Sequence, residues 1–298
     1  MTKKVLIYAI ISFWLVMMGL FVRREVLPYA FAHEPAGYGA VRAFARMNPT
    51  SHMLIYDGTE SRNLIGASET SYLLRADGTC EITTETVIDF RRHGQFLQNE
   101  ATRRLIASMV QQFILQSELV ISPENTLQSF RMTTHSPQLQ TTARGFVEDE
   151  TLHISAVLNN DDFEQPRHFH RSVPVQKRDI LAHNFMPAGW MGDLRVGQAW
   201  RFQIIDPISF GISSAQARVI SKENLRIGDA LYKVYVVEFP RQVGTARAYV
   251  DESNRLLRQT VEAWGLSIEF VRFPLPHQDD IEVPDNLLEQ FITSSPGD

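Results

Sequence analysis

The sequence contains very little cysteine: Cys80 is the one cysteine in 298 residues. A single thiol forms no internal disulfide and builds no cysteine-based metal site. Charge of one sign is not in large excess either, because 29 Lys and Arg stand against 34 Asp and Glu, for a formal net charge of -5. A surface without a basic excess argues against nucleic acid as the partner of this chain.

Motifs for nucleotide binding and for nucleophilic catalysis are missing as well. The chain has no GxxxxGK[ST] loop, no GxGxxG turn and no GxSxG elbow. Cys80 falls on the apolar side of a predicted strand, which favours a buried side chain over a nucleophile. The acidic pairs Asp161-Asp162 and Asp279-Asp280 lie in turn-like and tail-like sequence, which favours solvated carboxylates. We therefore expect no enzymatic activity, no cofactor and no resident metal.

The densest group of titratable residues is Arg167-His168-Phe169-His170-Arg171. If this stretch is a strand, His168 and His170 point to the same face, a spacing found in some zinc sites. His183 and Asp179 are the nearest candidates for a third ligand. The flanking arginines would repel a cation, so we favour a solvated basic strand or loop.

One long apolar run begins near the N-terminus, from Val5 to Val22, and it carries no charge. At 1.5 Å per residue it spans roughly 27 Å, close to the ~30 Å of a bilayer core. We expect an uncleaved signal anchor, although a cleaved signal peptide ending near Ala30-Phe31-Ala32 is an alternative. The residues expected to anchor the protein are Val5, Leu6, Ile7, Ile10, Ile11, Phe13, Trp14, Leu15, Val16, Leu20, Phe21 and Val22.

Charges flank this run almost equally, with Lys3 and Lys4 before it and Arg23 and Arg24 after it. Since only four residues precede the run, we favour a cytoplasmic N-terminus and an exported remainder. Arg23 and Arg24, with Arg42 and Arg46, either contact anionic lipid headgroups or balance charge near the bilayer.

After His52, the sequence alternates apolar with polar residues and is rich in turn-forming residues. Asp77-Gly78 is a strong hairpin signal, and apolar or small residues alternate with polar ones from Thr79 to Phe90. A second alternating strand covers 151–158 and ends in a turn at Asn159–Asp162. The turns between successive predicted strands are short, which implies antiparallel pairing. Further strands are expected at Ala199–Ile205, Gln216–Ser221, Leu231–Phe239, Thr245–Val250, Leu256–Ala263 and Leu266–Phe273.

Helical spacing is clearest from Asn99 to Phe113, where apolar residues form a stripe. A second short helix is expected at Lys177–Asn184, and a final helical turn at Leu287–Ile292. The chain divides into an anchor with a short cytoplasmic end (1–24), a juxtamembrane stalk (25–51), a domain rich in strands (52–273) and an acidic, Pro-containing tail (274–298). The fold class is mainly β (α+β): a curved antiparallel sheet that wraps one or two helices after a transmembrane helix.

Several blocks resemble the periplasmic half-barrel superfamily related to bacterial lipoprotein carriers, and within it a domain family of unknown function. The blocks are Met53–Gly58 with Leu64–Ala67, Leu119–Arg131, Asp193–Trp200 and Ala248–Gln259. The resemblance covers about 52–273 and consists of the pattern of strands and turns, without an invariant motif. It implies a half-barrel with a concave apolar face, and roles in acyl-chain binding or envelope assembly. No catalytic motif can be transferred from it.

The resemblance implies a bacterial protein. We therefore expect a single-pass protein of the inner membrane, whose exported part lies in the periplasm. We expect a non-enzymatic binding or accessory protein of the cell envelope, which handles a lipid, a lipoprotein or another hydrophobic ligand. A residual apolar groove on the concave face would favour this function. The alternative is a structural or scaffold subunit of an envelope complex, favoured by a filled barrel with an exposed edge.

Overall fold

The structure of the protein is a computed structural model. It describes residues 2–22, 41–42, 45–46, 49–58, 62–90, 112–137, 139–160, 165–174, 181–183, 194–205, 212–240, 245–263, 266–276, 283–284 and 286–292.

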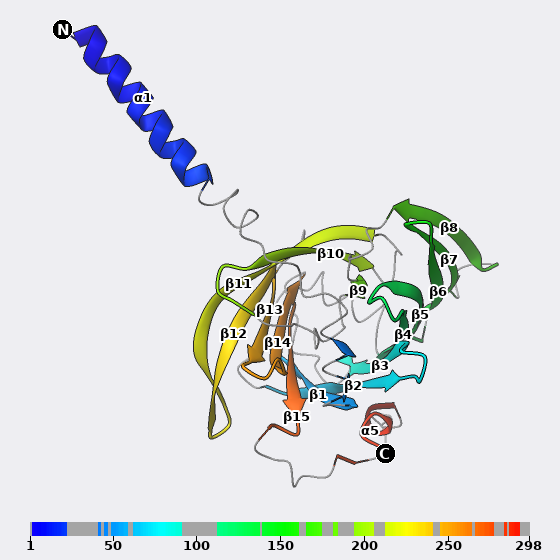
Figure 1. Cartoon of the computed structure of the whole chain (residues 1–298). Coiled ribbons are helices and arrows are strands. Elements are labelled where there is room, and N and C mark those ends of the chain that lie inside the picture. Colours follow the sequence, from blue (N-terminus) through cyan, green and yellow to red (C-terminus); the bar gives the residue numbers. More distant parts are fainter. Residues whose placement is uncertain are drawn as a thin grey trace.

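One curved sheet of fifteen strands dominates the described chain (Figure 1). Every neighbouring pair is antiparallel except β9 and β10, which are parallel. The strands are β1 (Thr50–Asp57), β2 (Leu64–Leu74), β3 (Cys80–Asp89), β4 (Gln112–Ile121), β5 (Leu127–His135), β6 (Leu139–Glu148), β7 (Thr151–Asn160), β8 (Arg167–Pro174), β9 (Leu181–His183), β10 (Ala199–Ile205), β11 (Ile212–Ile227), β12 (Ala230–Pro240), β13 (Thr245–Asp251), β14 (Leu256–Ala263) and β15 (Leu266–Phe273).

The strand order shows two meanders joined in the middle of the sheet. It runs β8-β7-β6-β5-β4-β3-β2-β1-β15-β14-β13-β12-β11-β10-β9, so β1 and β15 are the one neighbouring pair that is not consecutive in sequence. Their register runs from His52 opposite Phe273 to Asp57 opposite Ile268. The described sheet therefore ends at β8 and β9, which follow one another along the chain.

Residues with positive φ lie in the turns of several hairpins. Gly78 joins β2 to β3, Asn125 joins β4 to β5, and Asn254 joins β13 to β14, with φ values of 85°, 62° and 60°. The turn from β6 to β7 consists of two residues, Asp149 and Glu150, both with positive φ. Positive φ at both central positions is the geometry of a type I′ turn, whose twist matches that of the flanking strands.

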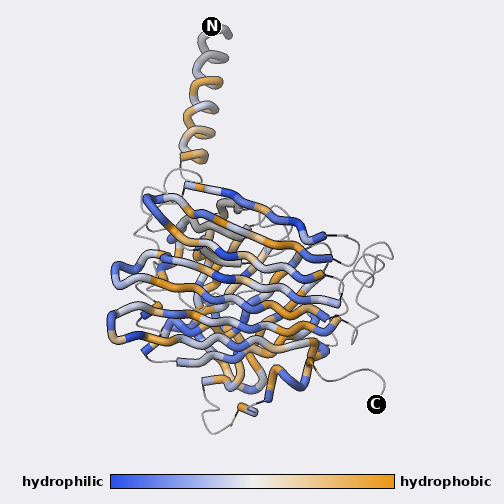
Figure 2. Tube along the Cα trace, turned by 90° about the vertical axis from the view of Figure 1, so that its right-hand side faces the viewer, coloured by the Kyte–Doolittle hydropathy of each residue, from blue (hydrophilic) through white to orange (hydrophobic). Residues whose placement is uncertain are grey.

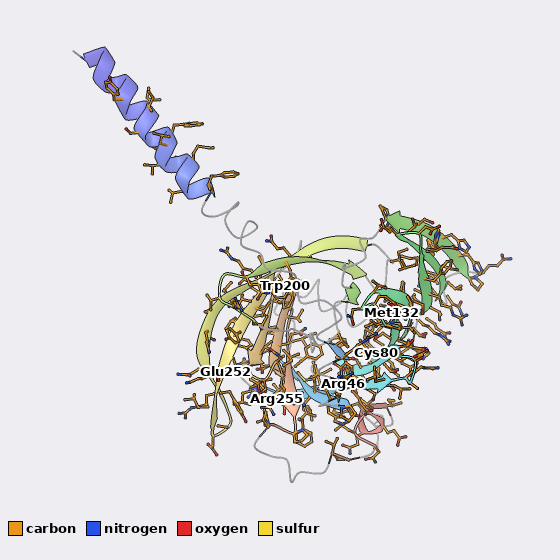
Figure 3. The ribbon with its side chains drawn as sticks, viewed as in Figure 1. Arg46, Cys80, Met132, Trp200, Glu252 and Arg255 are labelled. Carbon is orange, nitrogen blue, oxygen red and sulfur yellow. The ribbon has the colours of Figure 1, made fainter. Side chains whose placement is uncertain are left out.

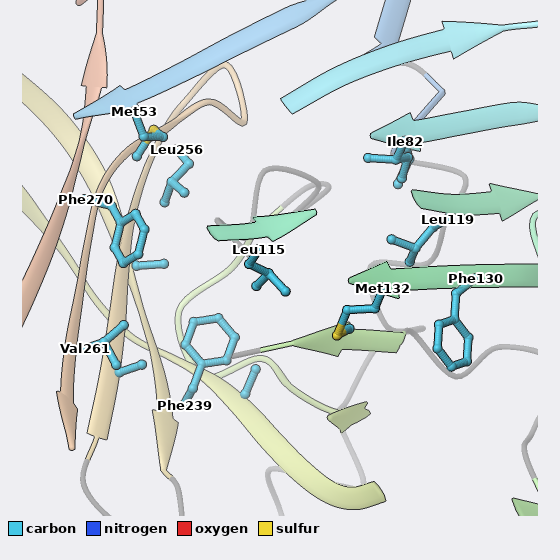
Figure 4. Packing of buried hydrophobic residues seen from close by; sticks show 14 of the residues in the cluster. Met53, Ile82, Leu115, Leu119, Phe130, Met132, Phe239, Leu256, Val261 and Phe270 are labelled. Carbon is cyan, nitrogen blue, oxygen red and sulfur yellow. The ribbon is translucent and has the colours of Figure 1, made fainter. Parts of the chain in front are cut away.

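The main core lies on the inner face of the curved sheet. Figure 4 shows Phe270, Val261 and Phe239 from one meander pointing toward the same interior as Leu115 and Met132 from the other. On β3 the inner residues Cys80, Ile82, Thr84, Thr86 and Ile88 are all buried. Hydrophobic and hydrophilic residues alternate along many of the strands in Figure 2. The inner face is thus a buried wall along most of the described strands, whereas the inner side of β8 is exposed.

Hydroxyl groups interrupt this wall on β2 and β3. Ser68 Oγ lies 2.7 Å from Thr86 Oγ1, and Thr70 Oγ1 lies 3.1 Å from Thr84 Oγ1. These cross-strand hydrogen bonds satisfy polar groups that would be costly to bury alone.

Two smaller apolar clusters lie on the outer face. The short helix α5 (Glu289–Ile292) packs there, and Phe291 and Leu287 cover Ala67 and Val87. This helix confirms the final helical turn predicted from the sequence. The second cluster joins the outer side of β11 and β12 to β14 and β15, through Leu225, Ile227, Val234, Leu257, Val271 and Leu275.

The fold class predicted from the sequence is confirmed in its main feature, a curved and mainly antiparallel sheet. The Asp77-Gly78 hairpin is present, and β10, β14 and β15 have the predicted bounds. The strand predicted at Gln216–Ser221 is the middle of a longer strand, β11. Of the predicted stalk (25–51), the described residues include Val41 and Ala45, which are buried in the main core, and Thr50 and Ser51, which begin β1.

Both predicted internal helices are wrong where the structure describes them. Gln112 and Phe113, the expected end of the helix from Asn99, belong to β4, and 99–111 lie outside the described residues. Leu181–His183 form β9 and not the end of a helix from Lys177. The turn expected at Asn159 and Asn160 is also wrong, because β7 continues through both.

The N-terminal apolar run forms the helix α1 (Thr2–Phe21), which lies apart from the sheet in Figure 1. Its described side chains, Tyr8 and those from Ile10 to Phe21, are all exposed. Within the residues that the structure describes, there is no helix whose length and apolarity suffice to cross a membrane. The membrane anchor stays a prediction from the sequence.

Ile82 and Thr83 test which face of β3 is the core. Ile82 is fully buried, whereas Thr83 is exposed and lies opposite Glu118. Ile82→Lys should lower the free energy of unfolding by more than about 3 kcal/mol, because it buries an unpaired charge. Thr83→Lys should change it by less than about 0.5 kcal/mol. Denaturant unfolding of both variants measures the difference, and equal losses would contradict this register.

Candidate binding surface at the sheet edge

The terminal strand β8 is the most exposed strand whose side chains are described. Seven of its eight residues are exposed, and Val173 is half-buried. Among the described strands, β8 pairs with β7 alone. An edge strand presents backbone N–H and C=O groups that another chain can bind.

The register of β8 separates two sets of side chains. His168 lies opposite Val157 and His170 opposite Ser155, both on the outer face. Phe169 and Arg171 lie opposite the buried Ala156 and Ile154, on the inner side. The prediction that the two histidines share one face of a strand is therefore confirmed.

An aromatic pair supports the outer face beside β8. Phe146 on β6 and His153 on β7 are opposite in register and stack with ring centroids 5.1 Å apart. His153 Nδ1 lies 3.0 Å from Ser172 Oγ, so it also holds the outer side of β8. Phe146 is still 52% exposed. This exposed aromatic ring beside polar groups is a feature typical of contact surfaces.

A shallow hollow of about 310 Å³ lies between these strands. We call its residues the edge patch: Arg144, Gly145, Phe146, His153, Ile154, Ser155, His170, Arg171 and Ser172. Guanidinium, imidazole and hydroxyl groups in one hollow can donate hydrogen bonds to a carboxylate or a phosphate. The edge patch is therefore suited to an anionic group.

The positive charge increases toward the edge of the sheet. On the outer face, Arg131 on β5 lies opposite Glu118 on β4 and opposite Arg144 on β6. Arg144 thus has a cation on one side and Ser155 on the other. This arrangement leaves the edge patch more cationic than the neighbouring part of the sheet.

The residues considered for metal binding or catalysis lie apart. No group of three or more His, Cys, Asp or Glu that could hold a metal occurs among the described residues. His183 is on β9, at the other end of the strand order, and Asp179 lies outside the described residues. Asp161-Asp162 and Asp279-Asp280 lie outside them too.

Cys80 is fully buried on the inner wall, and burial raises the pKa of its thiol (Figure 3). A neutral thiol without access to solvent is not an activated nucleophile. The sequence-based prediction of a buried cysteine is confirmed.

A buried carboxylate on the outer face has a structural role. Glu269 on β15 is almost fully buried and forms ion pairs with Arg62 and Arg258. The two guanidinium groups also lie over the rings of Tyr56 and Tyr249, 5.0 and 5.6 Å from the centroids. Burial raises the pKa of Tyr56. Paired in this way, Glu269 tolerates burial and links β15 to β14 and to the turn after β1.

A second hollow, of about 360 Å³, lies beside α5 on the outer face. Its lining includes Glu69 on β2, Glu85 on β3 and Glu289 on α5. Gln116 donates a hydrogen bond to Glu85, and His52 lies 3.6 Å from Glu69. The carboxylates are thus partly satisfied by neighbouring side chains, and the edge patch is the stronger candidate for binding.

The comparisons with known proteins give few likenesses. No protein-family model matches the chain, and no curated protein matches it. A solved structure that is similar is the beta-barrel-like protein of the domain of unknown function DUF1849 from Brucella abortus. It shares 9% sequence identity and a TM-score of 0.43, and the match covers 76% of this chain and 96% of that chain. So weak a likeness supports no argument about function.

The exposed histidines of β8 should matter little for stability. The double variant His168→Ala, His170→Ala should unfold within about 1 kcal/mol of the wild type, as surface positions do. Ile154→Ala, on the neighbouring strand but buried, should cost about 2 kcal/mol or more. Denaturant unfolding measures both. Stoichiometric zinc in the wild type that the double variant loses would show that the pair is a metal site.

Proposed function

We propose that this protein is a non-enzymatic scaffold of the cell envelope that contacts a partner protein through the edge patch. The observation that carries this proposal is the contrast between the two surfaces of the sheet. The inner wall is buried, whereas most of the edge patch is exposed and combines cationic, hydroxyl and aromatic groups. Exposed groups of this kind, on a rigid sheet, support binding to another macromolecule.

The carriage of a lipid is the weaker candidate. A carrier needs apolar side chains that line an accessible groove. On the inner face, residues such as Ile82, Leu115 and Phe270 are at most 1% exposed. The burial of these side chains favours the scaffold over the carrier.

We further propose that residues Val5–Val22 anchor the protein in the inner membrane and that the sheet lies in the periplasm. The support is the uncharged run itself, which forms α1 with exposed apolar side chains such as Phe13, Trp14 and Leu15. Apolar side chains exposed along the described part of a helix need an apolar environment or a partner.

Site-specific photo-crosslinking tests the scaffold function. A photoreactive residue at His170 should form one discrete protein adduct in the protein's own cells. The same group at Arg226, exposed on β11, should not form it. The added substitution Arg144→Glu should reduce the adduct about tenfold, because it removes a cation of the edge patch and introduces an anion.

The same adduct from both positions, or an adduct insensitive to Arg144→Glu, would contradict binding through the edge patch. Saturable binding of a fluorescent fatty acid at tens of micromolar, lost in Phe270→Ser but retained in Arg144→Glu, would favour the carrier instead.

The anchor predicts the location of the C-terminus. A reporter enzyme that works only outside the cytoplasm, fused after Asp298, should be active in cells. Deleting 5–22 should abolish this activity, because the chain then loses its export signal. A fusion active only as a cytoplasmic reporter would contradict the proposed location.

A further inference from the structure

We propose that the open edge of β8 binds an extended acidic segment of a partner protein, which adds to the sheet as one more strand. This inference rests on the proposed function and specifies the chemistry of the partner. Its basis is the far edge of β8, with which no described strand pairs, together with Arg167 and Arg171 on the inner side of this strand.

The backbone of β8 has the geometry that such an addition needs. The strand is paired with β7 along its whole length, from Thr151 opposite Pro174 to Leu158 opposite Arg167. Its conformation is therefore set before any partner arrives, and its far edge from His168 to Ser172 carries backbone groups that β7 does not use. An extended peptide can bind such an edge by main-chain hydrogen bonds, while its side chains determine specificity.

The side chains of β8 favour an acidic segment. Arg167 and Arg171 lie on its inner side, whereas on the outer face Arg144 of β6 lies across Ser155 from His170. A strand next to β8 would place alternate side chains beside these two sets. Carboxylates would thus be attracted, and a basic segment would be repelled.

A second copy of this chain fits the edge poorly. In an antiparallel pair of two β8 strands centred on Phe169, Arg167 of each copy would lie opposite Arg171 of the other. Like charges directly opposite each other destabilise a strand pair. The cations that attract an acidic strand therefore discourage self-association.

Phe169 adds an apolar position to this specificity. It is 46% exposed, on the inner side of β8 and opposite Ala156. The methylene groups of a carboxylate side chain on the added strand would cover its ring and remove the exposed surface from water. The expected segment thus directs its carboxylates to the inner side, where Arg167 and Arg171 flank Phe169, and its alternate apolar residues to the outer face.

Fluorescence anisotropy with labelled seven-residue peptides tests the proposal on the full-length protein in mild detergent. The acidic peptide EVEVEVE should bind saturably at pH 7.5, and about tenfold more weakly or less in 0.5 M salt, which screens exposed charges. The basic peptide KVKVKVK should not bind. The peptide EPEPEPE keeps the charge but lacks alternate N–H donors, so it should bind at least about tenfold more weakly.

Arg171→Glu should weaken binding of EVEVEVE about tenfold, and the matched control Arg226→Glu should change it less than about twofold. Equal binding of EPEPEPE would show attraction by charge alone and would overturn strand addition. Equal effects of the two substitutions, or dimerisation through β8 in sedimentation experiments, would overturn it as well.

The failure of this inference is separable from that of the proposed function. If EVEVEVE does not bind while the adduct at His170 still depends on Arg144, strand addition is wrong and the scaffold function stands. If the adduct itself is independent of the edge patch, the proposed function is wrong.

Discussion

The pairing of β1 with β15 is the interaction on which the rest of the structure depends. All other neighbouring strands are consecutive in the chain, so each meander could form by local pairing. The contact of Ile55 with Phe270 in register joins residues more than two hundred positions apart. The loss of chain entropy that this contact requires is offset only when both meanders bury their inner faces together. The shared core, with Met53 and Phe270 in one cluster, provides this burial.

The same pairing determines where the sheet is open. With the two chain ends of the sheet joined at its centre, the middle of the sequence forms its two margins, β8 and β9. A closed ring would hide both margins, since full closure of a barrel leaves no edge strand. The edge patch therefore exists because the described sheet ends between two consecutive strands. Its cations and the Pro174 at the end of β8 are features that natural edge strands use to limit unwanted pairing.

The sequence predicted those hairpins whose turns have a recognisable chemistry. Asp77-Gly78 supplies the positive φ of its turn without strain, and the strands around it were correct. Asp149 and Glu150 form a two-residue turn that few sequences of this kind would adopt, and β6 before it was not predicted. Phe113 was placed on a helical stripe because apolar residues at 105, 106, 109 and 110 fit a period of 3.6. Its own pairing with Ile88 shows that tertiary contacts decided the strand.

The candidate site was predictable only in part, because a sequence shows which residues share a strand and not which strand forms the edge. His168 and His170 were recognised, together with the arginines that flank them. Arg144 and Phe146 carried no signal, since they join the patch through registers with β7 that depend on the unpredicted turn. The charges of β8 indicate a binding surface only in combination with the position of this strand at the margin of the sheet. In the centre of the sheet, a strand with arginines on one face and histidines on the other would bury cations at a high cost in free energy. Its composition is compatible with an edge, and an edge is where a further strand can bind.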